Sequence, residues 1–431
     1  MHASYFQETT RWPLAAPRTL GQLLCLISLA GWLFICSSAV FPLWMLGREP
    51  TLTAAASETL RILLLPSLIA APILLVLRWR AVTGLLCRHP CLILLGIWIW
   101  LSAIWSVEPG VTLRRAASFS ANTVIVAWAA VTFSPAVLAR TLAAVALAIL
   151  GLSLLFGICL PDLAFMPDSG EFRGVFTHKN GMGLGLLLAA LLIAVAWHAR
   201  LMPRPTLLLG YAAIVALAVP VGSATTVMLL LILAGLHLPL VIAAWPRRMA
   251  AGGMLFLLLG CVSILLPLFL ARNRIILALG RDVTLTGRTE LWDFIDGFIA
   301  QRPITGYGYG AFFEVASVAE QISARIGWGA PNSHNGYREM LLGLGLVGLV
   351  LALGVLLGAL VRAVRGFIRD PHDLPSRFAF LYLCLYLFRN FSESDLLAHS
   401  DLTWTLAGFA ILLPTASTLS REPALRTGGL A

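Results

Sequence analysis

Long apolar runs follow one another along most of the chain and are separated by short polar connections. A run of roughly 20 apolar residues is the length that a helix needs to cross the hydrocarbon core of a bilayer. The pattern predicts twelve such spans, or eleven if the short run 377–391 does not cross. The predicted spans are 20–46, 60–77, 91–107, 116–133, 141–160, 181–197, 206–221, 225–245, 251–270, 340–361, 377–391 and 402–419.

One connection, residues 271–336, is far longer than the others. From Thr289 onward its apolar residues recur with helical spacing, which predicts an amphipathic helix that lies along the membrane surface and ends at Pro303. The predicted fold is an all-α polytopic membrane protein with one large loop. Its predicted regions are transmembrane helices in 1–170, a central region 171–362 that contains the loop, and C-terminal transmembrane helices in 363–431.

The composition supports this fold class. Of the 431 residues, 59% are hydrophobic and 12% are charged, whereas soluble domains carry about 25% charged residues. The net charge of +10 does not indicate nucleic-acid binding, because the basic residues lie between apolar runs rather than on one tail or face. The seven cysteines lie in or beside apolar runs, so neither a disulfide framework nor a cysteine metal site is predicted.

The distribution of charge orients the chain in the membrane. Arginines gather in connections on one side, including 78–88 and 362–377, and acidic residues gather on the other side. By the positive-inside rule both termini are cytoplasmic, and the loop 271–336 is periplasmic in a bacterial inner membrane. Few ionisable residues lie deep in a span, which argues against an ion-coupled transporter.

The first polar cluster lies directly before the span 181–197, on the outer side. It contains Arg173, His178 and Lys179 as a dense cationic group, followed by Asn180. Because exposed N–H groups at a helix N-terminus favour anions, this arrangement is typical of a phosphate-binding corner. The alternative interpretation is interfacial anchoring by long cationic side chains.

The second cluster opens the central part of the long loop and contains Arg281 and Arg288. Arg288 stands at the start of the predicted amphipathic helix, where a cation opposes the helix dipole. That unfavourable placement is explained if Arg288 faces an anionic ligand. The alternative is an ion pair with Asp282 or Glu290.

The later part of the loop adds aromatic and titratable candidates. The segment 303–310 alternates Gly and Tyr, so Tyr307 either offers a face on which a sugar ring stacks or belongs to a simple turn. His334, just before the span 340–361, is the candidate for proton transfer at neutral pH. Asn335 and Glu339 are placed to orient His334 or an acceptor hydroxyl.

Glu393 and Asp395 follow the span 377–391, with a spacing that suits a divalent cation in a metal-dependent transferase. The cationic clusters are denser than this acidic pair, and no D-x-D sequence occurs. We therefore predict a structural or acceptor-site role for the pair, and neither a metal nor another cofactor.

Taken together, these motifs resemble the O-antigen ligase family, which includes Wzy-type polymerases and ExoQ-like exopolysaccharide-production proteins. The motifs are G-R-D-V-T-L-T-G-R-T-E-L-W (280–292), R-P-I-T-G-Y-G-Y-G-A-F (302–312), S-H-N-G-Y (333–337) and G-L-G-L-V-G-L (343–349). The segment F-R-G-V-F-T-H-K-N (172–180) resembles the exopolysaccharide branch.

The resemblance implies a GT-C-like, metal-independent glycosyltransferase that uses an undecaprenyl-diphosphate-linked glycan at the periplasmic face. Membrane lipid and other exopolysaccharide assembly and export proteins are the implied partners. The family's loop Arg corresponds to Arg288 and its loop His to His334. A further family Arg, in a Ser-Arg motif, is missing from G-S-A-T-T (222–226). Unless the acceptor site differs, that charge comes from Arg173, Lys179 or Arg281.

The function expected from these features is polymerisation of lipid-linked repeat units into exopolysaccharide. Arg288 would stabilise the departing diphosphate, and His334 would act as the general base for the acceptor hydroxyl. The first alternative is a ligase that transfers a finished glycan to lipid A-core or another acceptor. The second is a flippase of lipid-linked oligosaccharides, which would be expected to place its key charges inside the bundle.

Overall fold

The computed structural model describes residues 19–39, 53–167, 169–242, 288–327 and 329–427, and helices dominate them. No β-strand occurs in these residues, so the all-α prediction is confirmed. The helices are α1 (Leu20–Cys36), α3 (Thr53–Leu77), α4 (Trp79–Leu86), α5 (Pro90–Leu101), η1 (Ser102–Ile104), α6 (Pro109–Thr132), α7 (Pro135–Cys159), α8 (Pro161–Ala164), α9 (Lys179–His198), α10 (Arg204–Val221), α11 (Ala224–Ile242), α14 (Arg288–Gln301), η2 (Phe312–Glu314), α15 (Ala316–Ile326), α16 (Gly336–Arg369), α17 (Leu374–Arg389) and α18 (Leu402–Thr427).

Five of the described helices are long and apolar enough to cross a membrane, namely α7, α9, α10, α16 and the part of α18 from Leu402 to Leu419. The residues Ile62–Leu77 of α3 form a sixth candidate with α4, although the pair is bent by 99°. Helices α1, α5 and α11 contain shorter apolar stretches, and α17 has 16 residues. By length and composition the described residues therefore contain five or six candidate spans, and the total of twelve stays a prediction. The predicted ninth span, 251–270, lies outside the described residues.

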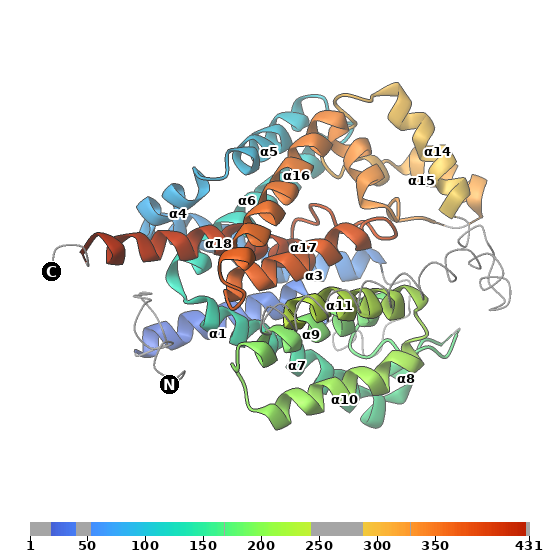
Figure 1. Ribbon diagram of the computed structural model, residues 1–431. Coiled ribbons are helices and arrows are strands. Elements are labelled where there is room, and N and C mark those ends of the chain that lie inside the picture. The colour runs from blue at the N-terminus through green and yellow to red at the C-terminus, as the bar shows by residue number, and fades with distance from the viewer. Residues whose placement is uncertain (1–18, 40–52, 168, 243–287, 328, 428–431) are drawn as a thin grey trace.

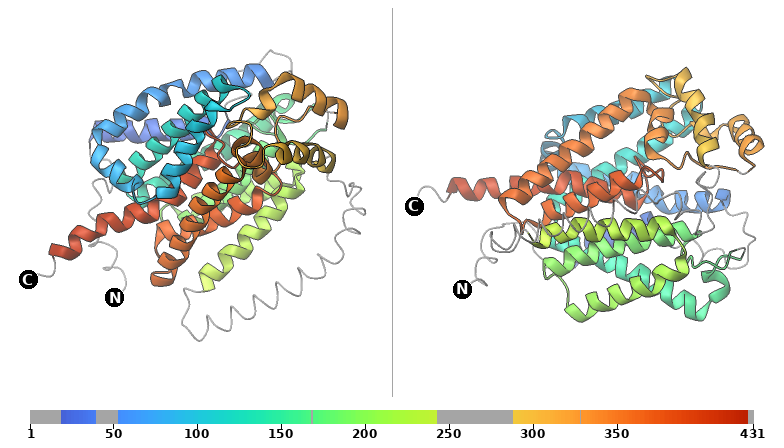
Figure 2. Two further views of the ribbon diagram at one scale, coloured as in Figure 1. Left: turned by 90° about the horizontal axis from the view of Figure 1, so that it is seen from above. Right: turned by 45° about the vertical axis from the view of Figure 1, so that its right-hand side comes forward.

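The three C-terminal helices pack among helices from much earlier in the chain (Figure 1). Helix α16 packs on α5, α18 packs on α6, and α17 contacts both α9 and α11. Helices α14 and α15 lie at one end of the bundle, and α18 runs out at the opposite end (Figures 1 and 2). We call the first of these the α14 end. It gathers the connections that carry most of the candidate residues.

Helix α14 confirms the helical periodicity that the sequence shows after Thr289. Leu291 and Ile295 are 0% exposed. They form a second small core with other residues of the loop, among them Phe312 of η2 and Ile322 of α15. The apolar stripe was predicted to lie along the membrane surface. Its central residues are instead covered by the chain itself, which fixes α14 on the bundle.

Helix α16 is interrupted at Gly345, whose φ of 66° and ψ of −167° are not helical. The turn after α14 enters this break. Tyr307 and Gly308 donate their N–H groups to the carbonyls of Leu342 and Gly343, at 2.7 and 2.9 Å. On the other side of the break, the N–H of Leu346 donates to a carbonyl of the same turn. The interruption is tolerated because these contacts satisfy its backbone groups.

The break predicts a strong requirement for glycine at position 345. A Cβ there would overlap the carbonyl of Ile304, and its backbone conformation alone costs about 1–3 kcal/mol for other residues. We expect Gly345→Ala to lower the thermal denaturation midpoint of the detergent-purified protein and its folded yield. Gly358→Ala is the matched control in the same helix, because the nearest atom to its Cβ would be 3.7 Å away. Equal stability of both variants would contradict this account of the break.

Candidate functional site

Two loops at the α14 end are joined by hydrogen bonds, and they carry the candidate residues His334 and Glu393. The first loop ends at Asn335, which caps α16 by accepting the N–H groups of Tyr337 and Arg338 at 3.1 and 3.0 Å. Glu339 reaches back and accepts the N–H of Ser333 at 2.9 Å. Asn335 and Glu339 were predicted to orient His334 or the acceptor. Their contacts act on the backbone around His334, so the loop is held through its main chain.

The second loop, residues 389–396, docks on the first. The N–H of Gly336 donates to the carbonyls of Asn390 and Glu393, at 2.9 and 2.8 Å, and the N–H of Asn335 donates to the Ser394 hydroxyl at 3.1 Å. Only glycine fits at position 336, because a Cβ would overlap the side-chain oxygen of Asn390. The two loops therefore hold a fixed position relative to each other.

An ion pair stiffens the second loop from inside. The guanidinium of Arg389 donates to Asp395, and both side chains are mostly buried. The side-chain oxygen of Asn390 accepts the N–H groups of Asp395 and Leu396 at 3.0 and 2.8 Å. The pair of acidic residues singled out in the sequence thus separates into two roles, since Asp395 braces the loop and Glu393 points to the site.

Helix α14 is attached to the first loop by two side chains. Arg338 makes two hydrogen bonds to the carboxylate of Asp296, at 2.8 and 2.9 Å, and lies over the ring of Trp292. The indole N–H of Trp292 donates to the carbonyl of Ser333 at 2.9 Å. These contacts place the first residue of α14, Arg288, beside the loop that carries His334.

Arg288, His334 and Glu393 meet at this point from three separate stretches of the chain. A guanidinium nitrogen of Arg288 lies 3.8 Å from Glu393 Oε1, and His334 Nδ1 lies 4.0 Å from Glu393 Oε2. A second guanidinium nitrogen of Arg288 donates to the carbonyl of Ser392 at 2.6 Å. The three side chains are 19%, 18% and 13% exposed, so the group is partly desolvated but still reachable.

The backbone of His334 has a φ of 49°, a left-handed conformation that is uncommon for residues other than glycine, although asparagine, aspartate and histidine adopt it more often than the rest. Its N–H donates to the side-chain oxygen of Asn332 at 2.9 Å, which helps to hold this conformation. Strained backbone of this kind is concentrated at functional sites, where the surrounding structure compensates for its cost. The conformation directs the imidazole towards Glu393.

The electrostatics of Glu393 match its position between two basic groups. Burial raises the pKa of its carboxyl, but the interaction with His334 and the charges of Arg389 and Arg288 outweigh that effect. The resulting pKa lies below the ordinary value of 4.5, so the group is a carboxylate at neutral pH. An ionised carboxylate beside an imidazole stabilises the imidazolium that forms when the imidazole accepts a proton.

His178 belongs to the surroundings of the same site. Burial and the charge of Lys179 lower the pKa of His178, whereas Glu393 raises it. His178 also caps α9, because its Nδ1 accepts the N–H of Asn180 at 3.1 Å. His178 therefore lies within electrostatic range of Glu393 and His334.

The other cations of the first cluster have partners within their own region. Arg173 donates to the carbonyls of Leu163 and Thr177, at 2.9 and 3.4 Å, and burial lowers its pKa. Lys179 forms an ion pair with Glu171, and this pairing lowers the pKa of Glu171. A Cβ on Gly222 would lie 3.2 Å from the Glu171 carboxylate. Lys179 and its partner thus stand beside the segment in which the family's Ser-Arg motif is missing.

Tyr307 occupies a buried position in the turn that enters the break of α16. Its side chain is 8% exposed, and its hydroxyl donates to the carbonyl of Phe298 at 3.0 Å. The rings of Phe298 and Phe312 pack against it, and Arg302 lies over its face. Of the two interpretations offered by the sequence, this geometry favours the turn over sugar stacking. Arg281 lies outside the described residues.

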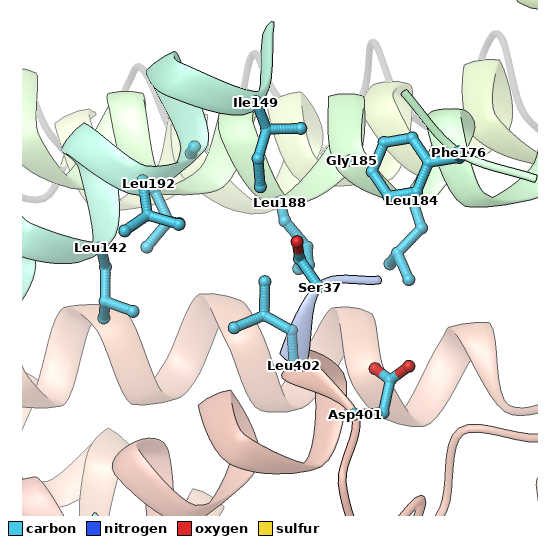
Figure 3. A pocket seen from close by; sticks show the side chains of 12 residues that line it. Ser37, Leu142, Ile149, Phe176, Leu184, Gly185, Leu188, Leu192, Asp401 and Leu402 are labelled. Carbon is cyan, nitrogen blue, oxygen red and sulfur yellow. The ribbon is translucent and has the colours of Figure 1, made fainter. Parts of the chain in front are cut away.

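An internal cavity of about 20 Å³ lies between α7, α9 and the start of α18 (Figure 3). Its walls are mainly aliphatic, including Leu142, Ile149 and Leu188, with Ser37 and Asp401 as polar members. Burial, with a further contribution from Asp395, raises the pKa of Asp401 to about 6. A space of this size holds about one water molecule and no sugar ring.

The sequence identified Arg288 and His334 but not the side chain that joins them. Glu393 lies 59 positions after His334, and nothing in the sequence pairs the two residues. The E-x-D spacing drew attention to Glu393 for its affinity for cations. In the structure this carboxylate lies beside a guanidinium and an imidazole, at 3.8 and 4.0 Å.

Two comparisons with known proteins bear on this site. A family model described as O-Antigen ligase matches residues 211–353, which include Arg288 and His334. The predicted resemblance to the O-antigen ligase family is confirmed. The match to the O-antigen ligase model ends before Glu393, so the third member of the site lies outside the matched segment.

The chain is also similar to the exopolysaccharide production protein ExoQ of Rhizobium meliloti (strain 1021). The two sequences are 29% identical over 341 residues, which cover 75% of this chain and 76% of the relative. The protein is thus a helical, multi-pass membrane protein that is similar to the O-antigen ligase family and to a protein of exopolysaccharide production.

Proposed function

We propose that the protein polymerises polyprenyl-diphosphate-linked oligosaccharide repeat units into exopolysaccharide at the periplasmic face of the inner membrane. The observation that carries the proposal is the meeting of Arg288, His334 and Glu393 at the α14 end. A guanidinium, an imidazole and a carboxylate in one partly desolvated place are the groups that glycosyl transfer from a diphosphate requires. The similarity to an exopolysaccharide production protein supports this choice of product.

In the proposed reaction, the bond between the anomeric carbon and the diphosphate oxygen breaks, and the lipid diphosphate leaves with the electron pair. The acceptor hydroxyl oxygen forms the new glycosidic bond, and its proton passes to His334. Glu393 holds the imidazole and stabilises the imidazolium. Arg288 stabilises the charge that develops on the diphosphate, a task suited to a planar guanidinium with several donors.

Arg288 is placed to exchange its present partner for the substrate. Its 3.8 Å separation from Glu393 exceeds an ordinary hydrogen-bond length, so this contact is weak. Its hydrogen bond to Ser392 anchors the side chain near the site. A diphosphate oxygen, with its larger negative charge, would compete well for the guanidinium.

Further cations are proposed to bind the same donor. His178 and Asn180 stand at the N-terminus of α9, where backbone N–H groups favour a phosphate, and Glu393 influences His178 electrostatically. Lys179 and Arg173 add positive charge nearby, and Lys179 is the candidate for the missing motif arginine because its partner Glu171 adjoins Gly222. Arg281 remains a proposed contact on the grounds of the sequence.

The α14 end is proposed to face the periplasm, with both termini in the cytoplasm. The positive-inside rule supports this orientation, because the last turns of α16, at the other end, carry Arg365 and Arg369. A donor that has already crossed the membrane would then reach the site directly. A periplasm-accessible cysteine at the exposed position Ser323 of α15 should react with a membrane-impermeant thiol reagent in intact spheroplasts.

A second candidate function is ligation of a finished glycan to another acceptor, which the description of the family model favours. Lipid-linked intermediates in a deletion strain distinguish the two. Single repeat units accumulate when a polymerase is missing, and long lipid-linked chains accumulate when a ligase is missing. We expect single repeat units, and the accumulation of long chains would replace polymerase with ligase as the function.

Glu393→Gln is expected to slow polymerisation by about tenfold to 10²-fold, as part of the 10²–10⁴-fold that positioned proton transfer supplies. The amide keeps the size of the side chain but removes the charge that stabilises the imidazolium. The loss should appear in kcat rather than in KM for the lipid-linked donor. Glu320→Gln, which changes an exposed carboxylate of α15, is the matched control and should retain near wild-type kcat.

The same substitution has a predicted effect on stability against pH. Because the pKa of Glu393 is lowered in the folded protein, its ion pairs stabilise the fold above the unfolded pKa and lose this effect as pH falls through the folded pKa. The thermal denaturation midpoint of the wild type should therefore fall on acidification, and Glu393→Gln should reduce this fall.

For the kinetic prediction, an unchanged kcat in Glu393→Gln would contradict the proposed role of this residue.

A further inference from the structure

An open depression of about 600 Å³ lies at the C-terminal end of α14, on the opposite end of that helix from Arg288. It is lined by Trp105, which directly follows η1, and by the consecutive residues Gln301 to Thr305. Gln301 and Arg302 are exposed, and Ile304 is 61% exposed. The reaction proposed above uses none of these residues.

The walls of the depression are held in place by the backbone contacts of the α16 break. The indole N–H of Trp105 donates to the carbonyl of Thr305 at 3.1 Å, and its ring packs against Trp98. The carbonyl of Pro303 accepts the N–H of Leu346 at 2.8 Å, and Arg302 rests on the ring of Tyr307. A preformed recess of this kind binds a ligand with little ordering cost.

We propose that this depression is a glycan subsite, which holds sugar rings of the growing chain away from the reaction centre. The inference rests on the proposed polymerase function. A sugar ring has apolar C–H faces and a rim of hydroxyl groups, and the recess contains a surface that suits each of these features. The indole of Trp105 provides an aromatic surface, and Gln301 and Arg302 provide hydrogen-bonding groups.

The electrostatics favour a hydroxyl-rich ligand over the phosphate of a lipid headgroup. The recess adjoins the C-terminal end of α14, where the helix dipole is negative and disfavours anions. Arg302 is its one cationic lining residue among those described. Sugar hydroxyls can donate hydrogen bonds towards this end of the helix, whereas a phosphate cannot.

The distance from the reaction centre suits a chain-holding role. Arg288 and Gln301 are the first and last residues of α14, and a rise of 1.5 Å per residue places them about 20 Å apart. Several sugar units span such a distance. A glycan that is held at both places stays bound between additions, so the subsite is expected to lengthen the product without changing the chemical step.

The test compares product length with the rate of repeat-unit consumption in proteoliposomes that contain the full-length protein and a purified lipid-linked repeat unit. We expect Trp105→Ala and Gln301→Ala to shorten the chains, with the initial rate of consumption unchanged. Trp105→Phe keeps an aromatic face and should restore most of the length. Trp100→Ala is the control, because Trp100 is an exposed apolar side chain of α5 outside the depression.

A binding measurement without turnover completes the test. The probe is a set of oligosaccharides from partial hydrolysis of the cell's own exopolysaccharide, and Trp105→Ala should weaken their binding by on the order of tenfold. Wild-type chain lengths and binding in all variants would overturn the subsite. An effect that depends on anionic phospholipid in the vesicles would assign the depression to a lipid headgroup instead. If the wild type bound these oligosaccharides in a Trp105-dependent way but made no polymer, the proposed polymerase function would be refuted, whereas the glycan subsite would be supported.

Discussion

Arg288→Ala is expected to reduce the rate of glycan polymerisation by about 10²–10³-fold, the effect of removing one preorganised donor to a developing oxyanion. The variant loses the guanidinium at the start of α14, while the hydrogen bonds of Arg338 and Trp292 that fix this helix remain. The protein should therefore fold normally, and the loss should appear in the chemical step. The measurement is the initial rate of lipid diphosphate release in proteoliposomes.

Two further variants make this result specific. Arg325→Ala removes an exposed arginine of α15, which belongs to the same loop, and should leave the rate unchanged. Arg288→Lys keeps the charge but lacks the planar fork of donors, so its rate should fall between those of the wild type and the alanine variant. A wild-type rate in Arg288→Ala would exclude the residue from the reaction.

His334→Asn is expected to slow the reaction by about 10²–10⁴-fold, the usual contribution of a positioned general base. Asparagine is the informative replacement because it tolerates the left-handed backbone that position 334 adopts. The loop should thus keep its shape, and the loss should reflect the missing imidazole. The measurement is again repeat-unit consumption, now at saturating donor.

The control for this variant is His372→Asn. His372 is exposed in the connection between α16 and α17, far from the α14 end in the fold, and its replacement should not change the rate. If both variants lost activity equally, or if His334→Asn polymerised normally, His334 would not be the base. A folded yield similar to that of the wild type is required of each variant.

The sequence predicted α14 well because its amphipathic periodicity stands out in a polar loop, and it placed Arg288 at the first helical residue. The break in α16 was not predicted. Gly345 lies within a long apolar run, and only the carbonyls of a distant turn show why the helix is interrupted there. The number of spans stays a prediction, because runs such as that of α17, with 16 residues, are short for a helix that crosses a bilayer alone.

The types of residue in the candidate site could be predicted from the sequence, but the contacts between their side chains could not. Arg288 and His334 have a chemistry that is recognisable in a linear sequence, whereas the role of Glu393 depends on a contact between distant loops. Asn335 and Glu339 were predicted to orient His334 or an acceptor hydroxyl, and in the structure their side chains accept hydrogen bonds from backbone N–H groups around His334. Local polar residues often satisfy backbone groups first, and a sequence alone does not separate that task from contact with substrate.

The central claim is that His334 and Glu393 work as one unit in the transfer of a glycan. The most direct measurement is a double-mutant cycle of His334→Asn and Glu393→Gln, with polymerisation rates in proteoliposomes. The account predicts that Glu393→Gln slows the wild type by at least about tenfold but scarcely affects the His334→Asn protein, because the carboxylate then has no imidazole to support. An equal loss in both backgrounds would show that the two side chains act independently, and would contradict the account.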